Sequence, residues 1–431
     1  MNNLKFNKEL KNFYILLLGE FISEFGSKMT SFALIMWAFE KSGSVMSAST
    51  LTFCTLLPSI LLSFFAGSLI DSWNKKRIML IANVIATIFS LITLILILNN
   101  QLNISYLYLI NFTLGVVSAF ENPAADVIIS LIVPEEYYTK TSGLYSFTNA
   151  FSTTFVPIIS TAFYAFLGLK VIVILDLFSF VFAFLSLLIF VHVPNNIIIA
   201  EAEEESFLSS CKQGIHYIIE RKGIFHLIIF MAFVNFIAAI YNCNFAPMIL
   251  SRNGNNKLEL GIVSSMVGIA GIVGSILVTL LKEPKKRIPF IINIMIFSFL
   301  FCNGMLGIGR NYYVWMVAVF AGNCLIPFLT ANVTYIMRTN IPIEMQGRVF
   351  SARNTLQYFS IPVGYIVGGV LTDKLLEPFM KTPSTLQQFF SYIVGTGKGA
   401  GNGLIYIIIA LLGFVGCCFF KSNEHLKSLD D

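Results

Sequence analysis

The first long apolar stretch of the chain carries charged and hydroxyl-bearing residues at helical spacing. These residues are Glu20, Ser23, Glu24, Ser27 and Lys28. In a helix that turns by about 100° per residue they fall within an arc of roughly 140°, so they line one face. Glu24 and Lys28 are four residues apart, in the order that favours an ion pair.

An ion pair between Glu24 and Lys28 leaves Glu20 over, because one lysine neutralises only one of two carboxylates. Ionisable side chains buried among apolar residues are costly to keep and are functional candidates by default. We therefore take Glu20 as the first candidate for proton uptake and release, Glu24 as the second, and Lys28 as their charge partner. The alternative is a purely structural ion pair that packs against another helix.

A second group of acids lies in the fourth and sixth apolar stretches. Glu121 and Asp126 flank Pro123, which interrupts helical hydrogen bonding and frees a backbone carbonyl. Glu121 is a candidate for a second proton carrier or for the counter-charge of a cationic substrate. Asp126 is nearer the end of its stretch, where bracing of neighbouring helices is at least as reasonable as coupling. For Asp176 we expect a structural hydrogen bond.

The second half of the chain offers neutral polar groups in its apolar stretches. Asn235, Asn242 and Gln357 are candidates for a substrate cavity, since their amides form hydrogen bonds without carrying charge. Proton chemistry is therefore expected in the first half, and hydrogen bonding to a substrate in both.

Residue patterns for catalysis, nucleotide binding or metal binding are absent from the sequence. The 7 cysteines include no C-x-x-C spacing, and the 4 histidines lie at the ends of apolar stretches or between them. No G-x-x-x-x-G-K-[ST] phosphate loop occurs. We predict that the chain is not an enzyme and has no catalytic residues, no cofactor and no metal site.

The composition predicts a membrane protein. Of the 431 residues, 56% are hydrophobic and 12% are charged, about half the charged share of soluble domains. Such a chain cannot cover a soluble surface with polar groups, which argues against a nucleic-acid partner and for the lipid bilayer. Apolar runs long enough to cross a bilayer predict twelve transmembrane helices, at 13–39, 46–70, 77–98, 105–131, 141–168, 171–192, 224–250, 258–281, 288–308, 312–337, 348–372 and 403–420.

The twelve predicted spans form two related halves. Lys75-Lys76-Arg77-Ile78 recurs 210 residues later as Lys285-Lys286-Arg287-Ile288, and several turn residues recur at similar offsets. We predict an all-α membrane protein with two pseudo-symmetric six-helix bundles. They span 1–193 and 224–431 and are joined by a cytoplasmic linker, 194–223. Two such halves suit a substrate site near the midplane and alternating access.

The linker and the loops give further expectations. Phe207–Glu220 is interpreted either as an amphipathic helix on the membrane surface or as a solvated connection. Nineteen lysines and arginines fall in the loops and tails on one side of the predicted spans, and eight fall on the other. Because basic residues favour the cytoplasm, we expect a multi-pass protein of the cytoplasmic membrane with both termini inside.

The connection between the second and third spans resembles the signature of the major facilitator superfamily, G-x-x-x-D-R-x-G-R-R. Four residues match it, the last two as basic residues: Gly67, Asp71, Lys75 and Lys76. Ser72 and Asn74 stand where the signature has Arg and Gly. The resemblance covers the whole chain and implies the family's twelve-helix fold. It also implies a gating role for the four matching residues.

Other segments are similar to bacterial macrolide-efflux-type members of that family. They include Glu40–Ser44, Ala119–Ala124 and Pro342–Ser351. The similarity implies a monomeric secondary transporter that exports an amphipathic, hydrophobic small molecule in exchange for protons. Export of a siderophore or movement of a lysolipid on the same scaffold remains an alternative. A membrane receptor or scaffold that transports nothing is a further alternative, in which the loops would bind the partner.

Overall fold

The computed structural model describes residues 10–134, 138–191 and 207–430, apart from some side chains within the helices. Every regular element in these ranges is a helix, as the composition predicts. The chain divides into two compact units. The first comprises residues 1–41 and 50–202, and the second comprises residues 42–49 and 203–431.

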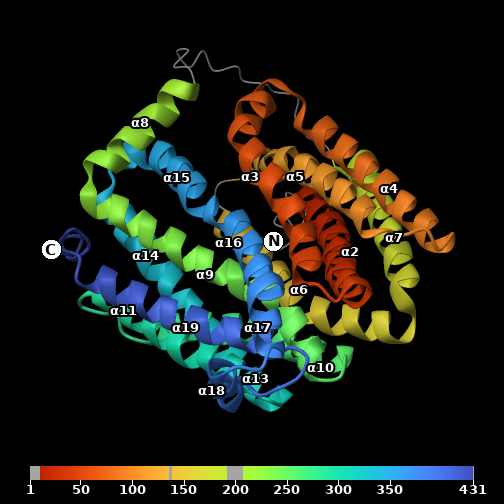
Figure 1. Ribbon diagram of the computed structural model, residues 1–431. Coiled ribbons are helices and arrows are strands. Elements are labelled where there is room, and N and C mark those ends of the chain that lie inside the picture. Colours follow the sequence, from red (N-terminus) through yellow and green to blue (C-terminus); the bar gives the residue numbers. More distant parts are fainter. Residues whose placement is uncertain (1–9, 135–137, 192–206, 431) are drawn as a thin grey trace. The chain divides into compact units, whose positions relative to one another are not determined.

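The first unit is built from long helices (Figure 1). They are α2 (Lys11–Ser42), α3 (Val45–Ser72), α4 (Lys75–Leu98), α5 (Ile104–Ile132), α6 (Tyr138–Phe166) and α7 (Gly168–Phe190). The first turn of α3 belongs to the second unit, and the helix continues from Thr50 in the first unit.

Short polar turns separate these helices. The side chain of Asn74 accepts a hydrogen bond from the Arg77 amide at 3.0 Å and thereby caps the start of α4. Between α2 and α3, Gly43 has a φ of +66°, and Gly168 at the start of α7 has a φ of +77°. Glycine adopts this left-handed backbone at little steric cost, so each reversal of chain direction needs few residues.

After residues 42–49, the described part of the second unit continues with α8 (Phe207–Glu220), so this segment is helical. It packs on α9 and α15. The further helices are α9 (Lys222–Arg252), α10 (Lys257–Leu280), α11 (Arg287–Phe297), α12 (Gly304–Ile308), α13 (Tyr312–Cys324), α14 (Ile326–Asn340), α15 (Ile343–Tyr358), α16 (Ser360–Val370), α17 (Glu377–Lys381), α18 (Thr385–Val394), α19 (Ala400–Lys421) and α20 (Glu424–Lys427).

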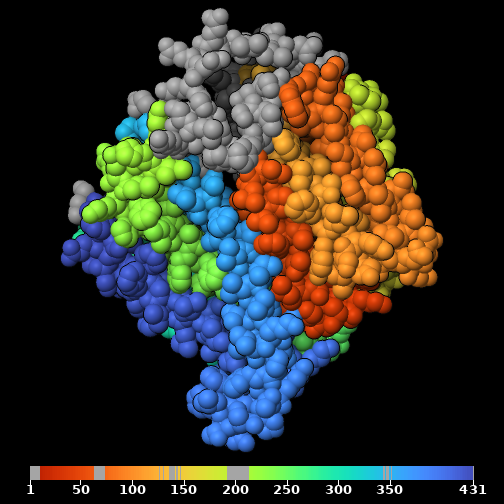
Figure 2. Space-filling model, turned by 45° about the horizontal axis from the view of Figure 1, so that its top comes forward, coloured from red at the N-terminus to blue at the C-terminus, as the bar shows by residue number. Residues whose placement is uncertain are grey.

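Two π-helical turns lie inside spans of the second unit. They are η2 (Ser298–Asn303), between α11 and α12, and η3 (Leu371–Leu376), between α16 and α17. Through η3 the helix continues to Lys381, past the predicted end of the eleventh span at 372. The segment that follows α16 projects as a lobe at one end of its unit (Figure 2).

Ten helical segments in the described residues are long and apolar enough to cross a membrane. Helices α2 and α6 also have spanning length, but α2 carries the charged stripe and α6 is rich in hydroxyl side chains. Counting both is compatible with the predicted twelve spans. The structure thus has the predicted class of fold, an all-α membrane protein.

The packing of α4 against α7 places polar groups inside and apolar groups outside. Asn83 of α4 and Ser179 of α7 are buried, whereas Ile81 and Phe178 on the same helices are 60% and 67% exposed. A soluble protein has the opposite distribution. Exposed apolar side chains along both helices give the unit a surface suited to lipid.

Candidate functional site

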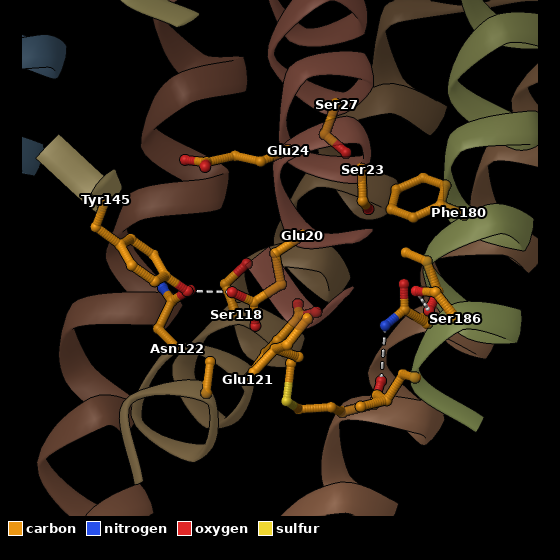
Figure 3. Close-up of a pocket in the computed structure, with 16 residues that line it drawn as sticks. Glu20, Ser23, Glu24, Ser27, Ser118, Glu121, Asn122, Tyr145, Phe180 and Ser186 are labelled. Atoms are coloured by element: carbon orange, nitrogen blue, oxygen red, sulfur yellow. Dashed lines mark hydrogen bonds between the residues drawn. The ribbon is translucent and has the colours of Figure 1, made fainter. Parts of the chain in front are cut away.

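A cavity of about 510 Å³ lies inside the first unit, where α2, α4, α5, α6 and α7 converge (Figure 3). Its polar lining consists of Glu20, Ser23, Glu24, Ser27, Asn83, Ser118, Glu121, Asn122, Tyr145 and Ser186. The three acids predicted as coupling candidates are therefore brought to one site, although α2 and α5 are far apart in the sequence.

Glu20 reaches into this cavity from α2 (Figure 3). One of its carboxylate oxygens accepts a hydrogen bond from the hydroxyl group of Tyr145 in α6. The Tyr145 ring packs against Phe13 with the ring centroids 6.5 Å apart, which helps to hold the hydroxyl group in place. Hydrogen bonds to a charged acceptor are stronger than those between neutral groups. A change in the charge of Glu20 therefore changes the strength of its hydrogen bond to α6.

The predicted ion pair between Glu24 and Lys28 is present. The Lys28 ammonium lies 2.8 Å from the Glu24 carboxylate, and their side chains are 35% and 51% exposed. Lys28 also donates a hydrogen bond to the Asn149 side chain of α6 at 3.2 Å. Because both side chains are this exposed, the ion pair contributes little to the stability of the fold. We therefore look for its role in the charges that it places near the cavity.

Glu121 enters the same cavity from α5, two residues before Pro123, which lies inside the same helix. Glu24 and Glu121 line the same cavity, so their carboxylates repel each other when both are ionised. Within the described residues no hydrogen bond or ion pair involves the Glu121 carboxylate. Repulsion of this kind makes neutralisation of one acid, by a proton or by an organic cation, favourable.

Asp176 lies outside the lining of this cavity and is buried in α7. Its carboxylate accepts hydrogen bonds from Ser27 of α2 at 3.3 Å and from Ser90 of α4 at 3.1 Å. It thereby ties three helices together, which is the geometry of the structural hydrogen bonding expected for it. Asp126 belongs to α5, but its side chain lies outside the described residues.

Several lining residues were not among the predicted site residues. Tyr145, Asn83 and Ser186 are neutral, and they come from three different helices. Asn83 is the one that the sequence signals, because an amide inside the apolar stretch of α4 needs a polar surrounding. Tyr145 gives no comparable signal, since tyrosine is common near the ends of spans.

The predicted gating residues lie at the connection from α3 to α4. The ammonium group of Lys76 donates hydrogen bonds to the backbone carbonyls of Leu188 at 3.1 Å and Val191 at 2.7 Å. A cation at the end of α7 satisfies carbonyls that the helix leaves open and complements its dipole. Lys75 precedes it at the start of α4. The matching Gly67 and Asp71 fall in the part of α3 whose side chains lie outside the described residues.

The cavity candidates of the second half belong to the second unit and are not among the residues that line this cavity. The side-chain amide of Asn235 in α9 donates a hydrogen bond to the backbone carbonyl of Gln357 in α15 at 3.3 Å. The Gln357 side chain is buried, and Asn242 is exposed. These contacts bring Asn235 and Gln357 together without defining a site for a substrate.

A metal ion would need several donor side chains at one place within the described residues. No group of three or more histidine, cysteine, aspartate or glutamate side chains there is arranged to hold a metal ion. The acids at the cavity are accompanied by hydroxyl and amide groups, which suit hydrogen bonding to protons, water or an organic substrate.

Comparison with known proteins gives the same class of molecule. Residues 16–365 match the family described as Major Facilitator Superfamily. The chain is 24% identical to macrolide efflux protein A of Streptococcus pyogenes over 374 residues, covering 86% of this chain and 92% of the relative. Its identity to macrolide efflux protein A of Enterococcus faecalis is also 24%, over 75% of this chain and 99% of the relative.

A solved structure has the same fold. A bacterial homologue of the iron transporter ferroportin, in its inward-facing state, superimposes with a TM-score of 0.67 at 16% identity, covering 96% of this chain and 99% of that one. The family match spans most of the chain, and the helices and exposed apolar surfaces are those of a multi-pass membrane protein. The chain belongs to the Major Facilitator Superfamily and is a transporter rather than an enzyme.

Proposed function

We propose that the chain exports an amphipathic, largely hydrophobic small molecule, of macrolide-like character, in exchange for protons by alternating access. The observation that carries this proposal is the cavity of the first unit, which is lined by Glu20, Glu24 and Glu121, with the ammonium group of Lys28 paired to Glu24. Three carboxylates and one cation leave excess negative charge when all are ionised. Protons or a cationic substrate are the species that neutralise it.

Glu20 is the proposed main site of proton exchange. When Glu20 takes up a proton, Tyr145 no longer donates to a charged oxygen, and the link between α2 and α6 weakens. Loss of the proton restores the link. Each proton that moves inward yields about 2.3 kcal/mol per 100 mV of membrane potential, which is sufficient to build a substrate gradient.

The apolar part of the substrate is proposed to bind a phenylalanine cluster whose α2 members directly follow Glu20 and Glu24 in the sequence. We define this cluster as Phe21 and Phe25 of α2 with Phe147, Phe151 and Phe155 of α6. Phe151 is at its centre: its ring centroid is 5.8 Å from that of Phe21, 6.2 Å from Phe25 and 4.4 Å from Phe155.

Part of the apolar surface of this cluster is exposed within its unit. Phe147 is 65% exposed and Phe155 is 40% exposed. A molecule with a greasy body and an amine would place the body on these rings and the amine near Glu24 or Glu121. The similarity of the chain to relatives named macrolide efflux protein A supports a large substrate of this kind.

The proposal extends to the cell. We infer a monomer in the bacterial cytoplasmic membrane, with both termini inside, that lowers susceptibility to the compounds it exports. Purified carrier in vesicles tests the coupling. Addition of a macrolide outside the vesicles should drive protons out of the lumen. Growth inhibition by macrolides, compared with and without expression, tests the same function in cells. If a siderophore or a lysolipid drives proton movement in the vesicles and no macrolide does, that compound replaces the macrolide as the proposed substrate.

A further inference from the structure

The start of α3 is held by a carboxylate that lies 329 residues later in the chain. Residues 42–49 belong to this unit, as does Asp373 of η3. The Asp373 carboxylate accepts hydrogen bonds from the Ser44 hydroxyl at 2.5 Å and from the backbone amides of Val45 at 3.1 Å and Met46 at 2.8 Å. The first amides of a helix have no partner within the helix, so the carboxylate satisfies donors that are otherwise open.

The helix does not need Asp373 in order to begin. Ser44 already caps α3, because its hydroxyl oxygen accepts a hydrogen bond from the Ser47 amide at 3.1 Å. The contacts of Asp373 are added to a helix start that already has this side-chain cap. They therefore fasten residues 42–49 to η3 and can be broken without unwinding α3.

A second contact lies one turn before Asp373, on the same side of its helix. A Cβ atom on Gly369 would come within 2.6 Å of the Ser49 hydroxyl oxygen and 3.0 Å of the Met46 Cα. Only glycine allows the two backbones to approach this closely. Gly369 allows close packing against the start of α3, and Asp373 accepts the hydrogen bonds from it.

We propose that Asp373 is a releasable latch for the transport cycle. Helix α3 runs unbroken from Val45 to Ser72, and from Thr50 onward it belongs to the first unit. Movement of the first unit during alternating access must therefore pull on residues 42–49 and detach them from Asp373. This inference rests on the proposed alternating access, but it does not depend on the substrate or on protons.

The charge pattern assigns the latch to the outer side of the membrane. Lys41, just before the segment, and Lys374, just after Asp373, both belong to the basic residues predicted to lie outside. Opening toward the outside is then the step that requires release. With the latch closed, the carrier favours the state in which this side is shut.

The same unit contains a matched control. Asp430 accepts hydrogen bonds from the backbone amides of Arg287 at 3.0 Å and Ile288 at 2.9 Å, at the start of α11. The contact resembles that of Asp373, but α11 lies wholly within the second unit. Asp430→Ala removes a carboxylate from a helix start without releasing any element of the first unit.

The test is a distance measurement between spin labels at the exposed positions Lys41 and Lys374, in a cysteine-free background. Asp373→Ala should increase the ratio of the long-distance to the short-distance population by about tenfold, within the usual range for coupled conformational states. Asp373→Asn, which keeps one acceptor oxygen, should lie between Asp373→Ala and the parent. Asp430→Ala should match the parent. Unchanged distances in Asp373→Ala, or an equal change in Asp430→Ala, would overturn the proposal.

A disulfide across the latch gives a second test, in which the contact is locked instead of weakened. The pair Ser44→Cys and Asp373→Cys should form a disulfide under oxidation that holds the labels at the short distance. Substrate or proton addition should not shift them, whereas it should shift the labels in the Ser44→Cys single variant, which cannot form the cross-link. If the cross-linked protein still changes distance, the latch is wrong even if export is confirmed. If no substrate moves protons but Asp373→Ala shifts the distances, the proposed function fails and the latch stands.

Discussion

The hydroxyl group of Tyr145 in α6 donates a hydrogen bond to the carboxylate of Glu20 in α2, inside the acid-lined cavity of the first unit. The same two helices share a second tyrosine–glutamate contact, in which Tyr164 donates to Glu40 at 2.6 Å. Neither Tyr164 nor Glu40 lines the cavity. The chain thus contains a pair of similar contacts between the same helices, one at the site and one away from it.

Replacement of Tyr145 by Phe should slow substrate–proton exchange without loss of folded protein. A hydrogen bond to a charged group is worth about 2 kcal/mol, so we expect roughly a tenfold lower exchange rate in vesicles. Tyr164→Phe removes the matching bond at Glu40 and should leave the rate within about twofold of the parent. Equal losses in both variants would show that the bonds act only by joining the helices.

Replacement of Phe151 by Leu should weaken substrate binding. Leu keeps most of the apolar volume but removes the ring contacts at the centre of the phenylalanine cluster, worth about 1 kcal/mol per aromatic pair. The expected result is a KM for export raised by about fivefold with kcat little changed. Phe178→Leu, on the exposed surface of α7, is the control. A change in kcat alone would argue against a binding surface here.

Replacement of Glu121 by Gln should affect cationic substrates most. The variant keeps the size of the side chain and removes the charge that would meet an amine. With an amphipathic amine and a neutral analogue of similar size, export of the amine should fall by about tenfold, as for loss of one charged contact. Export of the neutral analogue should persist, and Glu121→Asp should retain the preference for the amine. Equal losses for both compounds would instead assign Glu121 to proton transfer.

Replacement of Asp176 by Asn should lower stability rather than coupling. The variant disturbs the acceptor shared by Ser27 and Ser90, a cost of about 1–3 kcal/mol for a buried charged group. The thermal midpoint in detergent should fall, while proton release per folded molecule at low temperature should be unchanged. Normal melting together with lost proton release would place Asp176 in the proton path.

The sequence predicts those parts of this molecule that depend on local periodicity. The stripe of Glu20, Glu24 and Lys28 follows from helical spacing alone, and the ion pair it implies is present. Phe207–Glu220 is helical, as α8, but its packing on α9 and α15 follows only from the folded unit. The class of fold follows from composition and the lengths of the apolar runs.

Features that depend on contacts between distant helices were not predictable. Tyr145 is 125 positions from Glu20, and no local pattern links a neutral side chain in α6 to an acid in α2. Asp373 falls just past the predicted end of the eleventh span at 372, whereas the structure places it in η3. Its partners lie about three hundred residues earlier in the chain, so only the folded unit brings them together.

The most direct test of the account is proton release driven by a macrolide in vesicles that contain the Glu20→Gln variant. The substitution keeps the side-chain shape and removes the exchangeable proton, so the protein should reach normal levels and bind the macrolide, but release no protons. Glu40→Gln changes the matching acid of the same helix outside the cavity and should couple normally. Unchanged proton release in Glu20→Gln would contradict the assignment of coupling to this cavity.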